Sequence, residues 1–452
     1  MWRPGAFFPN SAMPMSNTAT LPTERRAAGF AITPEALRLL VAMAVLALMW
    51  ISLRPFGAGG VSEGGETDFA REGMLISQIG YSAMAAVVLA TVMTLVDRRL
   101  IARFVSVGWL AMFAIVGLSA FTGEADGVWR SVAFSLIVTA LAGAVTLLPA
   151  TARDFETALK TVSLVLLALC YGGLVVDPVS SIHQAFDLEA QHAGLWRGVF
   201  FHKNIAGPVM IMIGFGGIFL MRRRHFAAGT LIAALAFLFA FNAGSKTALA
   251  LAPLVVAIVL VPALFGLRLV AAIGAVVAIA GAHALTVGTV FVPAFDAVLR
   301  TFSETTTFTG RTAIWDFAGD YVLARPWTGF GFDGFWGTPL LLATEQPFDR
   351  AWDPRGIVHG HNGFFDIVLF FGLPGLFMLI WLTVFAPAID YVRAGRQTGN
   401  GPLADFFFMV IVFAVLTAAL ESFFFRRADP IWLTMIMALA GLRLCARMPL
   451  RS

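Results

Sequence analysis

The sequence predicts an all-α, polytopic integral membrane protein with about twelve transmembrane helices. Of its 452 residues, 59% are hydrophobic and 13% are charged, whereas soluble domains average about 45–50% apolar and about 25% charged residues. Apolar runs long enough to cross a bilayer, about 20 residues each, recur along the chain. Backbone groups in lipid must be hydrogen-bonded within their own segment, so these runs are expected to be helices.

Twelve apolar runs are predicted spans, at 36–53, 74–96, 104–121, 131–150, 161–177, 204–221, 226–243, 248–265, 269–290, 362–388, 405–424 and 430–446. They divide the chain into an N-terminal tail (1–35), an N-terminal bundle (36–177), a loop (178–203), central helices (204–290), a large loop (291–361), C-terminal helices (362–446) and a second tail (447–452). Loops as long as the two named here are usually functional in compact proteins.

The distribution of Lys and Arg predicts the orientation, because cytoplasmic loops carry an excess of both. With the N-terminus inside, the inner segments have a net charge of about +11 and the outer segments about −7. Both termini are therefore expected in the cytoplasm, and both long loops outside. The first thirty or so residues lack the apolar core of a signal peptide and are expected to form a tail. Cys170 and Cys445 fall near opposite faces, so no disulfide is expected.

The large loop is expected to contain its own amphipathic helix over residues 311–324. Its apolar residues recur at spacings of three and four, and Arg325-Pro326 ends the pattern. Six aromatic residues occur in or after this helix, and they favour either a segment lying on the bilayer surface or stacking against sugars. They are Trp315, Trp327, Phe330, Phe332, Phe335 and Trp336.

Cations on the outer side are unexpected, because that side is acidic overall. Arg197, Lys203, Lys246 and Arg311 nevertheless lie near membrane entry points, in segments poor in acids. Single cations there can simply extend toward the interface. Several of them, together with the histidines near residue 361, indicate a site for an anionic, lipid-anchored substrate.

Three other patterns carry less weight. Residues 329–334 match G-x-G-x-x-G but follow no strand of a βαβ unit, so we interpret them as a turn. Gly244-Ser-Lys-Thr247 ends like a phosphate-binding loop, but the first glycine is missing. His359-x-His361 lacks a nearby carboxylate or thiol set, so no metal site is predicted. No nucleic-acid-binding signature is present.

A series of short motifs resembles the O-antigen ligase/polymerase family of bacterial inner membranes, and within it the ExoQ-type exopolysaccharide polymerases. The series runs over roughly 190–380. It comprises Arg197-Gly-x-Phe-x-His-Lys-Asn204, Ser245-Lys246, Gly310-Arg311-x-x-x-Trp315, Pro326-x-x-Gly329-x-Gly331, His361-Asn362 and Phe371-Gly-Leu-Pro-Gly375.

The resemblance implies a metal-independent, inverting glycosyltransferase of GT-C-like helical fold, without a cofactor. It would act on the periplasmic face of the inner membrane on an oligosaccharide linked to undecaprenyl diphosphate, with a chain-length-regulating membrane protein as a candidate partner. Matching motifs assign catalytic roles to Arg197, Arg311 and His361. Lys203, Asn204, Lys246, Trp315, His359 and Asn362 become candidate substrate-binding residues.

Elementary chemistry agrees with these roles. The diphosphate leaves readily only if its developing charge is stabilised, and arginine holds phosphate oxygens in a bidentate manner. The attacking hydroxyl needs a base, and histidine titrates near neutral pH. His359 remains an alternative to His361 as the base. Asn362 fits a helix cap as well as a substrate ligand, and for His202 capping or packing is the preferred interpretation.

The leading functional hypothesis is a polymerase that joins lipid-linked repeat units into an exopolysaccharide or O-antigen. A ligase that transfers O-antigen to lipid A-core would share this chemistry and differ only in the acceptor. A transporter of lipid-linked sugars is the alternative from another class. It would carry charged residues through its spans, but these spans are nearly free of them.

Overall fold

The structure, a computed structural model, describes residues 32–57, 66–123, 127–187, 189–302, 308, 310–344 and 353–449. The expectation of a cytoplasmic N-terminal tail therefore lies almost entirely outside the described residues.

The predicted all-α fold is confirmed. The described residues form no β-strand, only an isolated antiparallel bridge between Ile182 and Trp196. The long helices are α1 (Pro34–Ile51), α2 (Glu66–Leu95), α4 (Val107–Leu118), α5 (Val128–Ala144), α6 (Ala152–Val176), α8 (Lys203–Arg222), α9 (Phe226–Asn242), α10 (Lys246–Val255), α12 (Arg268–Ala284), α14 (Pro293–Phe302), α15 (Arg311–Ala324), α17 (Gly363–Ile380), α19 (Gly401–Thr417) and α20 (Pro430–Arg447). Shorter ones are α3 (Arg98–Phe104), α7 (Pro178–Ser181), α11 (Val261–Leu264), α13 (Gly288–Phe291), α16 (Pro339–Leu342) and α18 (Ala386–Ala394).

Each of the twelve predicted spans coincides with helix, but their lengths differ. Among the described residues, eight helices are long and apolar enough to cross a membrane, and a bent pair at α3 and α4 could make a ninth span. The apolar helices α9, α12 and α19 have 17 residues each. At about 1.5 Å per residue they reach roughly 25 Å, less than the hydrocarbon core of about 30 Å. The chain is a multi-pass membrane protein.

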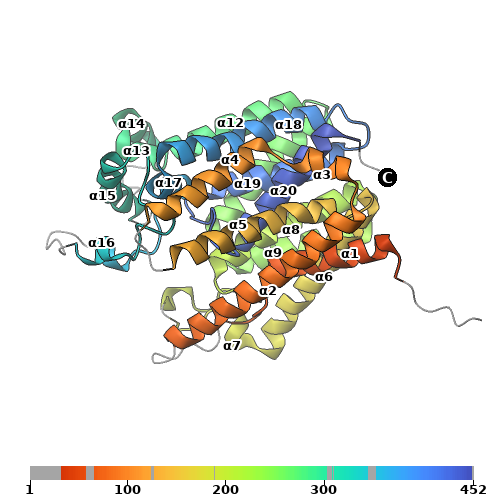
Figure 1. Cartoon of the computed structure of the whole chain (residues 1–452), viewed down its shortest axis with the longest axis horizontal. Helices are drawn as coiled ribbons and strands as arrows, with labels where there is room; N and C mark the ends of the chain where they lie inside the picture. The colour runs from red at the N-terminus through yellow and green to blue at the C-terminus, as the bar shows by residue number, and fades with distance from the viewer. Residues whose placement is uncertain are drawn as a thin grey trace, which may run out of the picture. The chain divides into compact units, whose positions relative to one another are not determined.

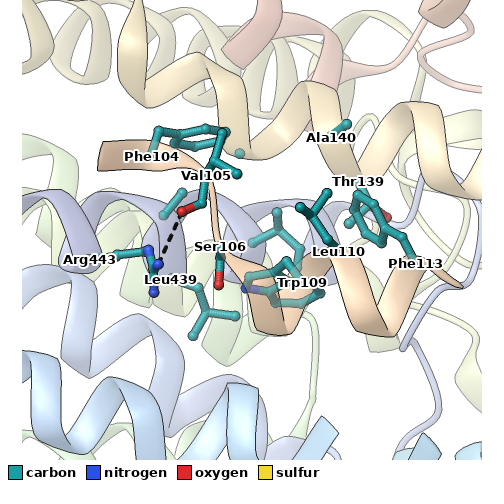
Figure 2. A pocket seen from close by; sticks show the side chains of 13 residues that line it. Phe104, Val105, Ser106, Trp109, Leu110, Phe113, Thr139, Ala140, Leu439 and Arg443 are labelled. Carbon is teal, nitrogen blue, oxygen red and sulfur yellow. Dashed lines mark hydrogen bonds between the residues drawn. The ribbon is translucent and has the colours of Figure 1, made fainter. Parts of the chain in front are cut away.

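The break between α3 and α4 bends the chain by 62°. A cavity of about 150 Å³ lies beside it, with walls from α5 and α20 (Figure 2). Arg443 of α20 donates from Nη2 to the carbonyl oxygen of Val105 at 3.2 Å. This bond satisfies a carbonyl at the bend, where the helical hydrogen-bond ladder is interrupted.

One end of the bundle is held together by buried ion pairs. The fully buried Asp405 accepts hydrogen bonds from Arg222, from two nitrogens of Arg268 and from the hydroxyl of Tyr391, at 2.7–3.1 Å. These residues come from α8, α12, α18 and α19, so a single carboxylate connects four helices. All of them belong to segments that the charge pattern assigns to the inner side.

At the other end, called the loop end below, lie the described parts of residues 177–202, 242–245, 285–362 and 418–429. In Figure 1 the helices α13 to α16 gather there, far from α3. The predicted helix over 311–324 is confirmed as α15. It packs with the start of α17 and residues 330–341 into a second hydrophobic core, separate from that of the bundle.

This second core corrects the interpretation of the aromatic residues. Trp327 is 69% exposed, but the other five are buried: Trp315, Phe330, Phe332, Phe335 and Trp336. They are therefore unavailable for stacking on a sugar or lying in the bilayer interface. A long loop between membrane helices needs apolar side chains to form a core of its own, and four of these aromatics provide it, whereas Phe332 packs into the core of the bundle.

A kink in α17 anchors the large loop. Gly372 has φ +64° and ψ −170°, which confirms the predicted kink. The carbonyls of Leu369 and Phe370 accept hydrogen bonds from the backbone of Phe330 and Gly331 at 2.8 and 3.0 Å. The G-x-G-x-x-G segment is thus a turn, as predicted, and it pairs with backbone groups that the kink leaves free.

Candidate active site

Arg197 lies inside the loop that was predicted to present it. Its side chain is buried, and it donates from Nε to the carbonyl of Ser180, from Nη2 to that of Val179 and from Nη1 to Asp187, at 2.9, 3.0 and 2.9 Å. All three guanidinium nitrogens therefore bind the protein's own loop. Contrary to our expectation, Arg197 is not presented to a phosphate, because three of its five N–H groups bind the loop and the residue is only 3% exposed.

Two imidazoles cap the start of α8. The backbone N–H of Asn204 donates to Nδ1 of His202 at 3.1 Å, and that of Lys203 donates to Nε2 of His183 at 3.2 Å. Capping by His202 was the preferred interpretation and is confirmed. The caps satisfy amide groups that a helix start leaves unpaired, and they fix where the Lys203 side chain begins.

Arg311 is the first residue of α15, directly after Gly310 in a left-handed conformation. Its Nη2 donates to Oε1 of Glu421 at 3.2 Å, and both side chains are partly exposed. Within the described part of the chain this is its one recorded ion pair. Arg311 thus differs from Arg197, because it remains accessible to a ligand.

Trp315, one turn after Arg311, fixes the histidine segment. It is fully buried, and its indole N–H donates to the carbonyl of Gly360 at 2.7 Å. On the other side of the same residue, Asp366 accepts from the backbone of Gly360 at 2.9 Å and from the indole of Trp336 at 2.8 Å. Gly360 is thus held from both sides, and the segment keeps a fixed position relative to α15.

His361 follows Gly360 with a left-handed φ of +52°, a strained conformation for a residue with a Cβ. Asn362 is the N-cap of α17, accepting from the backbone of Phe365 at 3.0 Å and donating to the carbonyl of Ala419 at 3.0 Å. Asn362 is fully buried, so it acts as a cap and is not exposed to substrate. Nδ1 of His361 is buried and has no hydrogen-bond partner among the described residues.

Both histidines are held neutral. Burial and the nearby charges of Arg311 and Arg426 lower the pKa of His361 to about 4, although Glu189 acts in the opposite direction. Burial and the neighbouring imidazole of His361, together with the same arginines, lower the pKa of His359 to about 2. Near neutral pH both rings are therefore neutral. Nδ1 of His359 already accepts the backbone N–H of His361 at 3.3 Å, whereas Nδ1 of His361 has no such bond among the described residues.

Glu421 and Arg426 were missed by the sequence analysis. They lie between α19 and α20, and burial raises the pKa of Glu421 against the opposing effect of Arg311. The outer cations singled out in sequence lie in segments poor in acids, whereas Arg426 stands between Glu421 and Asp429. A search for any cation beside an outer span end would have found it.

The structure brings most of the remaining candidates together. Lys203 is within electrostatic range of Glu189, Glu421 and Lys246. The charges of Arg311 and Arg426 in turn act to lower the pKa of Glu421, so these two arginines also lie near it. The start of α8, the start of α10, α15 and residues 359–361 therefore face one region. In the described residues the one group with metal-ligand spacing is Glu189, His192 and His202, which the sequence analysis did not identify.

Comparison with known proteins agrees with the expected resemblance. Residues 210–380 match the family model described as O-antigen ligase. The match contains Lys246, Arg311 and the segment 359–362, and excludes Arg197 and Lys203.

A 105-residue stretch is 29% identical to the exopolysaccharide production protein ExoQ of Rhizobium meliloti (strain 1021). The alignment covers 22% of this chain and 23% of that protein, so it spans less than a quarter of either.

Proposed function

Because residues 210–380 match the O-antigen ligase family model, we propose that this protein is a glycosyltransferase of the bacterial inner membrane. It joins oligosaccharide repeat units, carried on undecaprenyl diphosphate, into an exopolysaccharide or O-antigen at the periplasmic face. Both termini then lie in the cytoplasm. The similarity to a protein named for exopolysaccharide production favours the polymer branch.

Within the structure, one observation supports the proposed chemistry: the buried imidazole of His361 lies within electrostatic range of Arg311 and Arg426. His361 accepts the proton of the acceptor hydroxyl, and Arg311 and Arg426 hold the diphosphate. The pKa of about 4 in the unliganded site is low for a general base. A bound diphosphate would neutralise the two arginines, so the pKa of His361 would rise toward the operating pH when substrate is present.

The chemistry needs nothing beyond these groups. The acceptor oxygen attacks the anomeric carbon of the donor sugar from the side opposite the diphosphate, so the configuration inverts. A glycosidic C–O bond forms, the bond from the anomeric carbon to the phosphate oxygen breaks, and undecaprenyl diphosphate leaves with the electron pair. The hydroxyl proton moves to His361. The arginines stabilise the developing charge, as a preorganised electrostatic site does.

Other residues support this arrangement. Lys203 and Lys246 add positive charge for the second phosphate or for an acidic sugar. His359, whose ring lies 4.1 Å from that of His361, remains the alternative base. Trp315, Asn362 and Arg197 act through the backbone segments that they hold. Asn204 stays a proposed substrate-binding residue, and a chain-length-regulating membrane protein is a proposed partner.

A ligase would use the same site with lipid A-core as acceptor, and a transporter would not need His361. Cells lacking the protein distinguish the three functions. Single repeats accumulating on the lipid carrier support the polymerase. Long lipid-linked chains that never reach lipid A-core indicate a ligase. Full rescue of the deletion by His361→Ala and by Arg311→Ala would contradict the proposed site and favour transport.

A further inference from the structure

Three imidazoles and a carboxylate meet where the loop of residues 177–202 joins α8. The ring centroids of His183, His192 and His202 lie 4.9–5.8 Å from one another. Oε2 of Glu189 lies 2.6 Å from Nε2 of His202 and 3.5 Å from Nε2 of His192. Such a concentration of nitrogen donors exceeds what capping one helix requires.

Three of these residues offer ligand atoms to a common point. One atom each from Glu189, His192 and His202 lies within 4.8 Å of the others, and all three side chains are partly or fully exposed. His183 is not counted as a metal ligand, because its Nε2 accepts the backbone N–H of Lys203 and its Nδ1 lies 3.3 Å from Oδ2 of Asp187. The donor set is therefore two imidazoles and one carboxylate, with an accessible fourth position.

We propose that Glu189, His192 and His202 form a binding site for a late first-row divalent cation, Zn²⁺ above all. Two imidazole nitrogens and a carboxylate oxygen, with water in the fourth position, are a common tetrahedral zinc set. Such a set disfavours Mg²⁺ and Ca²⁺, which prefer oxygen ligands. The site lies within electrostatic range of His361, whose pKa Glu189 raises, but none of its three residues is assigned a step in glycosyl transfer.

Binding has a structural consequence for α8. In the unliganded chain Nδ1 of His202 accepts the N–H of Asn204, so the ring proton resides on Nε2 and points at Glu189. A metal ion on Nε2 requires that proton to move to Nδ1, and the cap bond to Asn204 then breaks. One lost cap is a small cost beside metal coordination. The ion would therefore bind and loosen the first turn of α8, next to Lys203.

The test uses the full-length protein without a histidine tag, treated with chelator, dialysed and titrated with ZnCl₂ by calorimetry. We expect one Zn²⁺ per chain, with affinity reduced at least tenfold in His192→Ala and in Glu189→Gln. His192 caps no helix, so its variant should remain folded, and thermal unfolding checks this. MgCl₂ should not compete.

His225→Ala is the matched control, since His225 also contacts a glutamate, Glu156, at 3.0 Å, but has no second imidazole in the described cluster. It should bind zinc like the wild type. Equal zinc binding by wild type and His192→Ala, or no binding by folded wild type, would overturn the proposal. In the latter case the cluster serves only as a hydrogen-bonded cap of α8. These outcomes do not depend on glycosyltransferase activity, so they leave the proposed function untouched.

Discussion

Arg197 and Arg311 carry the same side chain and looked equivalent in sequence, yet the structure gives them different surroundings. Arg197 is buried, and all three of its guanidinium nitrogens bind residues 179–187. Arg311 is partly exposed and bonds Glu421 through one nitrogen. The difference shows that an arginine near a membrane entry point can either stabilise its own loop or remain available to bind a ligand. The hydrogen bonds that its guanidinium makes within the protein decide which role it has.

His361 and His359, which lie within electrostatic range of Arg311, give the strongest test of the comparison between Arg311 and Arg197. We expect His361→Ala to lower the rate of polymer formation about 10²–10⁴-fold, the usual contribution of general base catalysis, without loss of folded protein. The measurement is the rate with purified lipid-linked repeat units. His359→Ala is the control and should lose less. If His359→Ala is inactive and His361→Ala retains full activity, the base has been assigned to the wrong ring.

Arg311→Ala should come next, with a rate loss of about 10²–10³-fold, as for one donor that stabilises transition-state charge. Arg311→Lys should recover only part of it, since an ammonium cannot reproduce the bidentate grip. Thermal unfolding should remain near that of wild type, because the ion pair with Glu421 is partly exposed. Full activity of Arg311→Lys would show that charge alone suffices.

Arg197→Ala should behave differently, lowering stability rather than the rate per folded molecule. Removing it takes the donors from two carbonyls and one partner from the Asp187 carboxylate, which keeps the backbone N–H of Gln184. The loss is therefore at most the roughly 3–5 kcal/mol of a broken buried pair. Thermal unfolding in detergent measures it, with Asp187→Asn as the milder comparison. A well-folded Arg197→Ala protein that is inactive would restore Arg197 to a direct role with the diphosphate.

The sequence predicted the helices well because apolar runs and the amphipathic spacing of residues 311–324 reflect local physics. Asn362 and His202 as caps were also readable, since each stands directly before a helix. The kink at Gly372 followed from Gly and Pro inside a span.

Pairing between distant segments could not be predicted. Nothing in the sequence indicates that Trp315 bonds Gly360 rather than facing a sugar, or that Arg197 is enclosed by its own loop. Glu421 and Arg426 lie some 60 residues after His361 in the printed sequence, so their place in the site is a property of the folded bundle. The metal-ligand group likewise depends on a turn that brings His192 back to His202.

The smallest predicted effect concerns the pH dependence of Arg426→Gln, which tests whether the accessible cations set the state of His361. The lowered pKa, about 4, keeps the imidazole neutral as pH falls below 6.5, and the base is lost only near pH 4. Removing the positive charge of Arg426 raises the pKa of His361, so the acid limb of kcat/KM moves to higher pH. At pH 5 the variant should lose a larger share of its neutral-pH kcat/KM than wild type.

The control is Arg197→Lys, which keeps a charge inside the loop and should leave the acid limb of the kcat/KM profile in place. If the acid limb of the kcat/KM profile were unchanged in Arg426→Gln, burial alone would hold His361 neutral. The accessibility of the arginines would then have no effect on the pKa of the base.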